Sequence, residues 1–257
     1  MCSKSTWKRP FLTYGHETLK FRVFLFLLLG KGEEKMSYIK DPKLIEEKSF
    51  EIIQEIITQT RPEYAFRNRE EELVMKRAIH TTADFDYLDN LVFTHDALAK
   101  IRETIRHGGM IFTDTNMALS GMNKRILDQY GCRYRCYVNE PETAEIAKQQ
   151  GITRSMAGIQ LAAREEERKL FVIGNAPTAV YKILEMADAG KLDADAVVGV
   201  PVGFVGAAES KEALYESDIP AVVTRGRKGE AIWLQPSLTQ CYMRCKRRWP
   251  YGRLCVS

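Results

Sequence analysis

The sequence predicts an α/β protein: a single domain with a mainly parallel sheet flanked by helices. Two observations support this prediction. Between residues 110 and 224, short apolar runs alternate with helical patterns, as strands and helices do in a parallel sheet that is covered on both faces. The middle of the chain also has no internal repeat and no low-complexity linker, which favours one domain.

Three helices are expected ahead of the first of these strands. The first begins at Asp41-Pro42 and ends near Thr60, the second is capped by Asn68 and ends at His80, and the third opens at Thr94 and ends at Gly108-Gly109. A further helix follows Gly174–Pro177 and reaches Gly190. These boundaries rest on capping residues, prolines and glycines.

The expected strands are the apolar runs that follow. They are Met110–Phe112, Arg133–Val138, Lys169–Ile173, Ala196–Val200 and Ala221–Thr224. Ligands of parallel sheets bind where the loops meet at the carboxyl ends of the strands. The loops after these runs are therefore the first place to look for a site.

Charge is distributed unevenly along the 257 residues. The whole chain has a formal net charge of +4, but residues 1–35 hold seven Lys or Arg against three acids, and residues 230–257 hold five against one. Residues 36–229 are left with 26 bases and 30 acids. The chain reads as an acidic globular domain, 36–229, between two compositionally foreign ends.

Neither end is expected to belong to the domain. The apolar run 23–29 is too short to span a bilayer, no signal cleavage site follows it, and 1–35 reads as a non-native or mis-called leader ahead of a natural start at Met36. Residues 230–257 lack periodicity and read as the product of a frameshift after Gly229. The cysteines Cys241, Cys245 and Cys255 are one ligand short of a structural zinc site.

Three loops at expected strand ends have compositions suited to ligands. Gly174–Thr178 places a glycine turn at a helix N-terminus, which favours carboxylate or phosphate groups. Gly199–Lys211 combines three glycines and a proline with apolar residues; it is either a tight structural turn or a surface that backbone offers to a flat ligand. Arg225–Gly229 is a cluster of cations suited to carboxylates, and Arg154 at another helix start could contribute likewise.

Few side chains point to catalysis by themselves. His80 and Arg77 face one side of a helix, and Ser49 interrupts an apolar helix face. Taken alone, a histidine at a helix end such as His80 is more often a capping or surface residue than a catalyst, and Ser49 reads as a core hydroxyl bonded to the preceding turn. No Ser-His-Asp order, H-E-x-x-H or C-x-x-C motif occurs, and no metal site is expected.

These segments, in this order, resemble the precorrin-8X methylmutase (cobalt-precorrin-8 methylmutase) family of cobalamin biosynthesis. The resemblance covers residues 37–229. Its most specific parts are Ile173–Ala179, Pro201–Lys211 and Arg225–Arg227, together with the helix that ends Lys76-Arg77-Ala78-Ile79-His80. The family continues after Gly229 with Gly-Ser and an alanine-rich helix, and this sequence departs from it there.

The resemblance implies an isomerase that moves a methyl group from C-11 to C-12 of a tetrapyrrole bearing many carboxylates, giving hydrogenobyrinate or cobyrinate. It implies a cytoplasmic homodimer without cofactor, protein-bound metal, nucleic acid or membrane partner. Carried over, His80 is the acid/base and Arg77 and Ser49 contact substrate. We further expect Arg154, Asn175, Arg225 and Arg227 to bind polar arms, and the backbone at Gly203 and Gly206 to lie against the ring.

Two other classes stay open at this point. A nucleotide-binding α/β enzyme would use Gly174–Pro177 as its phosphate turn, although G-x-G-x-x-G and the P-loop lysine are missing. A nucleic-acid-binding module would rest on the two basic ends, but residues 36–229 have an excess of acids, which counts against that class.

Overall fold

The structure, a computed structural model, describes residues 39–229. The expected leader 1–35 and the expected frameshifted tail 230–257 lie outside the described residues. The chain divides into two compact units, Met1–Ile45 and Glu46–Ser257. In the first unit, the Asp41 carboxylate accepts a hydrogen bond of 2.8 Å from the backbone N–H of Lys43, where helix α2 (Pro42–Thr60) begins. No helix of the described part is long and apolar enough to cross a membrane.

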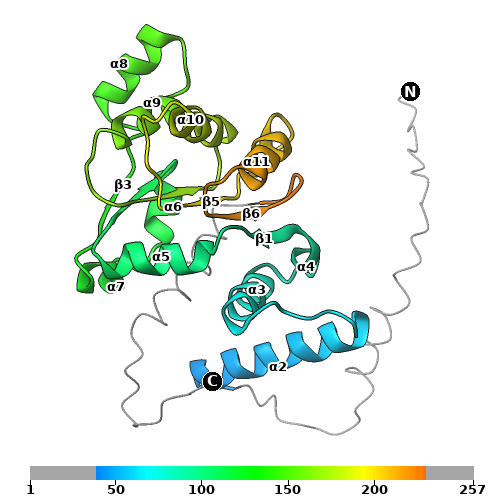
Figure 1. Ribbon diagram of the computed structural model, residues 1–257. Helices are drawn as coiled ribbons and strands as arrows, with labels where there is room; N and C mark the ends of the chain where they lie inside the picture. Colours follow the sequence, from blue (N-terminus) through cyan, green and yellow to red (C-terminus); the bar gives the residue numbers. More distant parts are fainter. Residues whose placement is uncertain (1–38, 230–257) are drawn as a thin grey trace, which may run out of the picture. The chain divides into compact units, whose positions relative to one another are not determined.

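The second unit is built on a six-stranded sheet with the order β1-β6-β5-β4-β2-β3. Its strands are β1 (Leu91–Phe93), β2 (Met110–Thr113), β3 (Arg133–Arg135), β4 (Lys169–Ile173), β5 (Ala196–Gly199) and β6 (Ala221–Thr224). Every neighbouring pair is parallel except β1 with β6, which is antiparallel. The α/β class with a mainly parallel sheet is confirmed (Figure 1).

Nine further helices of the described residues connect and cover these strands. They are α3 (Arg69–Thr82), α4 (Tyr87–Asn90), α5 (Ala97–Arg106), α6 (Asn116–Gly121), α7 (Lys124–Gln129), α8 (Pro141–Gln150), α9 (Arg154–Ala162), α10 (Pro177–Asp188) and α11 (Ala207–Glu216). The expected cap of α3 is present, because the Asn68 side chain accepts from the N–H groups of Glu70 and Glu71.

The structure differs from the sequence prediction at β1 and at the start of α5. The sequence gives no sign of β1, a three-residue edge strand. Helix α5 begins at Ala97 and not at Thr94, because the Thr94 hydroxyl accepts the backbone N–H of Ala221 at 3.0 Å and so fastens the chain to the start of β6. Strand β3 ends at Arg135, earlier than expected, since it pairs with β2 over three residues only.

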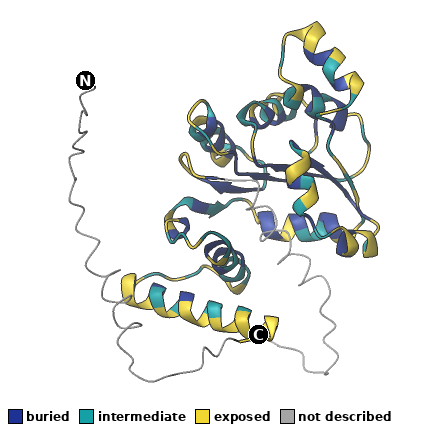
Figure 2. Cartoon of the chain, turned by 180° about the vertical axis from the view of Figure 1, so that it is seen from behind, coloured by how far each residue is buried: buried dark blue, intermediate teal, exposed yellow. Residues whose placement is uncertain are grey.

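Strands β2, β4, β5 and β6 are buried on both faces, and their alternate residues face opposite cores, whereas β3 at one edge is partly exposed. Ile111, Val172 and Val198 face one core, which α3, α5, α6 and α7 complete. Phe171 and Val197 face the other, which α8, α9, α10 and α11 complete. Figure 2 shows the central strands as buried and much of α2 as exposed. This three-layer arrangement leaves only the two edges formed by strand ends open to ligands.

Charged groups close the amino-terminal edge of the sheet. Arg168, directly before β4, donates from Nε and Nη2 to Asp195, at 2.9 and 2.7 Å, and from Nη1 to Glu103 at 3.0 Å. Asp195 also accepts the backbone N–H of Lys169 at 2.8 Å. The Arg168 side chain thus joins α5 to the starts of β4 and β5.

We predict that Arg168→Met lowers the Tm by about 3 °C at neutral pH, because it leaves two carboxylates without their partner. The hydrogen bond from Arg168 holds the pKa of Glu103 below its usual value, so this stabilisation is present at neutral pH and is lost as the pH falls through the folded-state pKa. Between about pH 7 and about pH 3 the variant should therefore lose less stability than the wild type. Urea titrations across this range measure the difference, with Lys191→Met as the control; equal losses would contradict the prediction.

Candidate functional site

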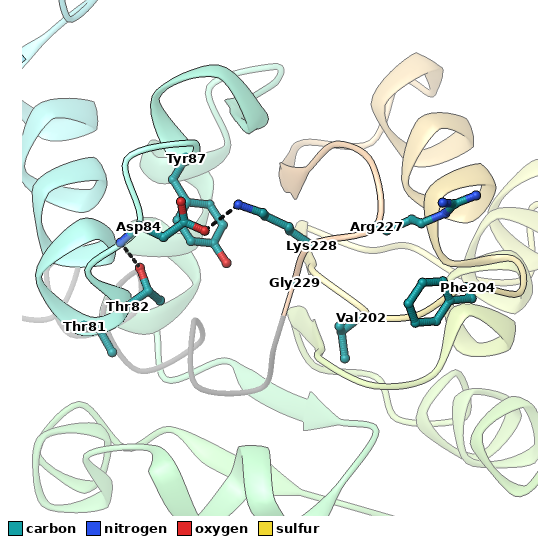
Figure 3. A pocket seen from close by; sticks show the side chains of 9 residues that line it. All are labelled: Thr81, Thr82, Asp84, Tyr87, Val202, Phe204, Arg227, Lys228 and Gly229. Atoms are coloured by element: carbon teal, nitrogen blue, oxygen red, sulfur yellow. Dashed lines mark hydrogen bonds and ion pairs between the residues drawn. The ribbon is translucent and has the colours of Figure 1, made fainter. Parts of the chain in front are cut away.

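A cavity of about 450 Å³ lies at the carboxyl ends of β5 and β6. Three segments line it: the end of α3 and the turn into α4, the loop after β5, and the loop after β6. The lining residues are Thr81, Thr82, Asp84, Tyr87, Val202, Phe204, Arg227, Lys228 and Gly229 (Figure 3). The cavity therefore lies at the edge where the parallel topology is expected to hold a ligand.

His80 occupies the last turn of α3, one residue before the cavity lining begins. Its imidazole is exposed and packs edge-on against the Phe50 ring of α2, with 6.0 Å between the ring centroids. The Arg77 guanidinium lies over the same ring, 5.0 Å from its centroid, and forms an ion pair with Glu46. Ser49, the neighbour of Phe50, is half-buried. The structure thus brings the helix segments of three predicted site residues together, with Phe50 between His80 and Arg77.

Lys228 connects the loop after β6 to the end of α3. Its Nζ lies 2.6 Å from Oδ2 of Asp84 and also binds Oδ2 of Asp86. In Figure 3 the Lys228 side chain extends across the cavity wall towards Asp84. The hydrogen bonds that Lys228 donates to Asp84 and to Asp86, the first having the larger effect, raise its pKa to about 12. The turn that follows His80 is therefore fastened to the sheet.

The glycine turn after β4 already holds a carboxylate that belongs to the protein. Asp114, which follows β2, is buried and accepts the backbone N–H groups of Gly174, Asn175 and Ala176 at 3.0, 2.7 and 2.7 Å. Burial raises the pKa of this carboxyl, and the three N–H groups oppose that shift. The turn does favour an anion, as its sequence suggests, but Asp114 occupies the donors that a phosphate would need.

Arg154 and Asn175 lie near each other at the same edge but do not line the cavity. The Thr153 and Thr178 hydroxyls, 2.9 Å apart, join the start of α9 to the start of α10. Both Arg154 and Asn175 are exposed. The two residues therefore form an outer part of the carboxyl edge.

The loop after β5 presents apolar side chains to solvent. Phe204 is 84% exposed and Val205 is 91% exposed. Gly203 and Gly206 have φ of 149° and 73°, values that favour glycine, and the Gly203 N–H donates to the carbonyl of Arg227 at 3.3 Å. Arg227 in turn lies over the Phe204 ring at 5.7 Å. The two glycines thus hold an exposed apolar surface against the cationic loop.

Arg225 points away from the cavity, towards α11. Its Nε and Nη2 donate to Glu212 at 3.0 and 2.6 Å, and its guanidinium lies over the Tyr215 ring at 4.6 Å. Of the predicted arginines, only Arg227 is among the residues that line the cavity.

Within residues 39–229, no cluster of His, Cys, Asp or Glu side chains has the geometry to hold a metal ion. Cys132 is buried and Cys136 is half-buried, and both are free thiols. The side-chain chemistry of the described cavity is that of hydroxyls, carboxylates, cations and aromatic rings.

Comparison with known proteins identifies the family. The family model described as precorrin-8X methylmutase matches residues 44–233. A cobalt-precorrin-8 methylmutase of Salmonella typhimurium is 54% identical over 195 residues, which are 76% of this chain and 91% of that protein. The chain belongs to the precorrin-8X methylmutase family. It is accordingly a methylmutase, an isomerase of cobalamin biosynthesis.

Other members of the precorrin-8X methylmutase family agree with this assignment. A cobalt-precorrin-8 methylmutase of Methanothermobacter thermautotrophicus is 40% identical over 72% of this chain and 84% of its own length. A crystal structure of a precorrin-8X methylmutase from Thermus thermophilus superposes with a TM-score of 0.69 at 31% identity, covering 79% of this chain and 96% of that one. The fold and the family are thus supported by sequence and by structure.

Several residues of this methylmutase cavity were not predicted as site residues. Asp84 lines the cavity at the end of a helix, and Asp114, outside the lining, directly follows a strand; Lys228 belongs to the cation cluster 225–229 that the sequence does indicate. The signal that could have found them is their position, since polar side chains that directly follow parallel strands meet at one edge. Tyr87 and Phe204 gave no such signal.

We predict that Asp114→Asn loosens the turn after β4. Asparagine offers one acceptor oxygen where the carboxylate offers two, and its amide donors would face backbone donors. Amide hydrogen exchange at Gly174, Asn175 and Ala176 should become about tenfold faster or more. Asp128→Asn, at an exposed carboxylate that accepts from the Tyr134 hydroxyl, is the control. Unchanged exchange in Asp114→Asn would contradict the prediction.

Proposed function

We propose that the protein moves a methyl group from C-11 to C-12 of the macrocycle, with His80 as the acid/base, and gives cobyrinate from cobalt-precorrin-8 or hydrogenobyrinate from precorrin-8X. The observation that carries this proposal is the position of His80: an exposed imidazole in the last turn of α3, next to the residues that line the cavity. Histidine is the side chain that most often acts as a general acid and base in enzymes.

The proposed reaction needs one proton, which His80 donates to the substrate and later takes back. The His80 imidazolium protonates a macrocycle nitrogen, and electron density is redistributed over the ring. The bond from the methyl group to C-11 breaks as the bond to C-12 forms, in a 1,5-sigmatropic shift. The nitrogen then returns its proton to His80, so atoms and charge balance without any redox partner.

Cations around the cavity suit a substrate with many carboxylates. Arg227 lines the cavity, and Arg77 lies one helical turn before His80. Arg77 is paired with Glu46 in the free protein, so a substrate carboxylate would take the place of Glu46 there. Arg154 and Arg225, with Asn175, lie farther out and would meet more distant arms.

The apolar loop after β5 suits the face of the macrocycle. The glycine backbone at Gly203 and Gly206 allows close approach, while Phe204 and Val205 offer apolar surface that is otherwise exposed to water. Burying these two side chains against a flat ring would favour binding by the hydrophobic effect.

We favour the cobalt-containing substrate, and place the reaction in the cytoplasm. The two relatives described above, at 54% and 40% identity, are both cobalt-precorrin-8 methylmutases by name. The cobalt is part of the substrate and asks for no metal ligand from the protein. The cytoplasmic location rests on the family resemblance alone.

We propose in addition that two copies associate through α2. Ile52 of α2 is exposed. Ser49 and Ile56, about one turn to either side of it on the same stripe of the helix, are only half-buried. The cavity of about 450 Å³ is small for a tetrapyrrole with acidic arms, which favours a site that a second copy completes beside α2.

We predict that His80→Ala lowers turnover by about a thousandfold or more, because it removes the proposed proton donor. Binding should survive, since the cations and the apolar loop remain. Turnover is followed by the absorbance of the corrin product from cobalt-precorrin-8, and binding by the colour that the purified protein retains. His107→Ala, at an exposed histidine whose Nδ1 lies 2.8 Å from the Glu103 carbonyl, is the control. Normal turnover in His80→Ala would rule out the assignment.

We predict that Ile52→Glu converts a dimer into a monomer, because a carboxylate would be buried in the apolar contact. Sedimentation velocity measures the change. Glu55→Gln, on the same helix and exposed, should leave the dimer intact. A wild-type protein that is monomeric at all concentrations, or an Ile52→Glu variant that stays dimeric, would show that α2 is not the contact.

A further inference from the structure

Lys211 is a buried cation that the proposed reaction does not use. It lies one turn into α11, which follows the exposed loop after β5, and its side chain is fully buried. Its Nζ donates to the carbonyl of Lys228 at 2.5 Å and to the Thr224 hydroxyl at 3.4 Å. Among the residues that the structure describes, it forms no ion pair.

A buried lysine without an ion pair costs free energy of folding, which is not explained if the side chain only fills space. Burying an ammonium group without a carboxylate costs free energy, and an apolar side chain of the same length would fill the same volume without that cost. Burial lowers the pKa of Lys211 to about 8, which reflects the same cost. The hydrogen bonds of Nζ are therefore the feature to explain.

The two hydrogen bonds of Lys211 Nζ hold the loop after β6, which forms one wall of the cavity: one goes to the loop itself at Lys228 and the other to Thr224, the last residue of β6. The Lys228 carbonyl accepts from Lys211 and also from the Thr224 hydroxyl, the latter at 2.9 Å. The two donors fix the backbone of the loop at Lys228. At its far end Gly229 lies so close to the Val200 backbone that any side chain there would collide with it. The loop is thus held at the Lys228 carbonyl and against the end of β5.

The side chain of Lys228 is held by the turn that follows His80. While the Lys228 carbonyl is bound by Lys211, the Lys228 ammonium binds Asp84 and Asp86. A continuous series of hydrogen bonds therefore runs from the buried face of α11, through Lys228, to the end of α3. This series spans the cavity wall.

We propose that Lys211 is a positioning residue for the methylmutase reaction: by binding the Lys228 carbonyl it fixes the loop after β6 against the end of α3, and so sets the shape of the substrate cavity. This inference rests on the proposed function, since it takes the cavity beside His80 as the substrate site. Lys211 itself touches no reacting atom.

The test is Lys211→Met, which keeps the length of the side chain and removes the donor. The KM for cobalt-precorrin-8 should rise about tenfold or more, the kcat should change much less, and the Tm should stay the same or rise because a buried charge is removed. A merely structural lysine would lower the Tm and leave the KM of the folded fraction unchanged. That result, or an unchanged KM in a stable variant, would overturn the proposal.

Two further variants keep the outcome decisive. Thr224→Val removes the second donor to the same carbonyl without touching a charge, and should raise the KM in the same direction; if Lys211→Met does not fold, an unchanged KM in Thr224→Val overturns the proposal. Lys182→Met, at a lysine of α10 that pairs with Glu185 and lies outside the cavity lining, is the matched control with unchanged KM and kcat.

A double-mutant cycle tests whether Lys211 acts through Lys228. Lys228→Met should raise the KM in the wild type but add little to Lys211→Met, because the same loop is already released. Fully additive effects would contradict the proposed connection. If the wild type converts cobalt-precorrin-8 and Lys211→Met equals it, only the inference about Lys211 fails; if His80→Ala equals the wild type, the proposed mechanism fails independently.

Discussion

The burial of the parallel sheet on both faces is the constraint on which the rest of the structure depends. Strands β2, β4, β5 and β6 are buried along their whole length, and helices cover both sides. Polar chemistry can then reach the sheet only at its two edges of strand ends. At the amino-terminal edge Arg168 binds Asp195 and Glu103, and these ion pairs stabilise the fold. At the other edge the loops are left to form a cavity.

Two buried charges of opposite sign organise that second edge. Asp114 holds the turn after β4 through three backbone N–H groups, and Lys211 holds the loop after β6 through one carbonyl and one hydroxyl. In each case a side chain from a neighbouring element satisfies the main chain of a loop, which fixes the loop before any ligand arrives. Loops ordered in this way lose less conformational entropy on binding.

The sequence predicts local features well and long-range partners poorly, for physical reasons. The Asn68 cap and the strand of residues 169–173 depend on residues close in the chain, and both are as expected. Strand β1 is too short for its periodicity to be visible, and its pairing with β6 spans more than a hundred residues. Lys211 ends the glycine-containing segment 199–211, and nothing in the sequence marks it as buried; only the folded chain brings Lys228 to it. His80 and Arg77 were identified through the family resemblance, because one histidine at a helix end has no distinctive pattern.

The pairing of cations in the free protein bears on which ligands the site accepts. Arg77 is paired with Glu46 and Arg225 with Glu212. A ligand with one carboxylate would exchange one ion pair for another and gain little. A ligand with many carboxylates on a rigid ring pays its loss of translational freedom once and exchanges several pairs, while its flat face covers the exposed Phe204. On the proposed function, an arrangement of this kind would select for a large polyanionic ring and against small acids, which is the selectivity that action on a tetrapyrrole would require.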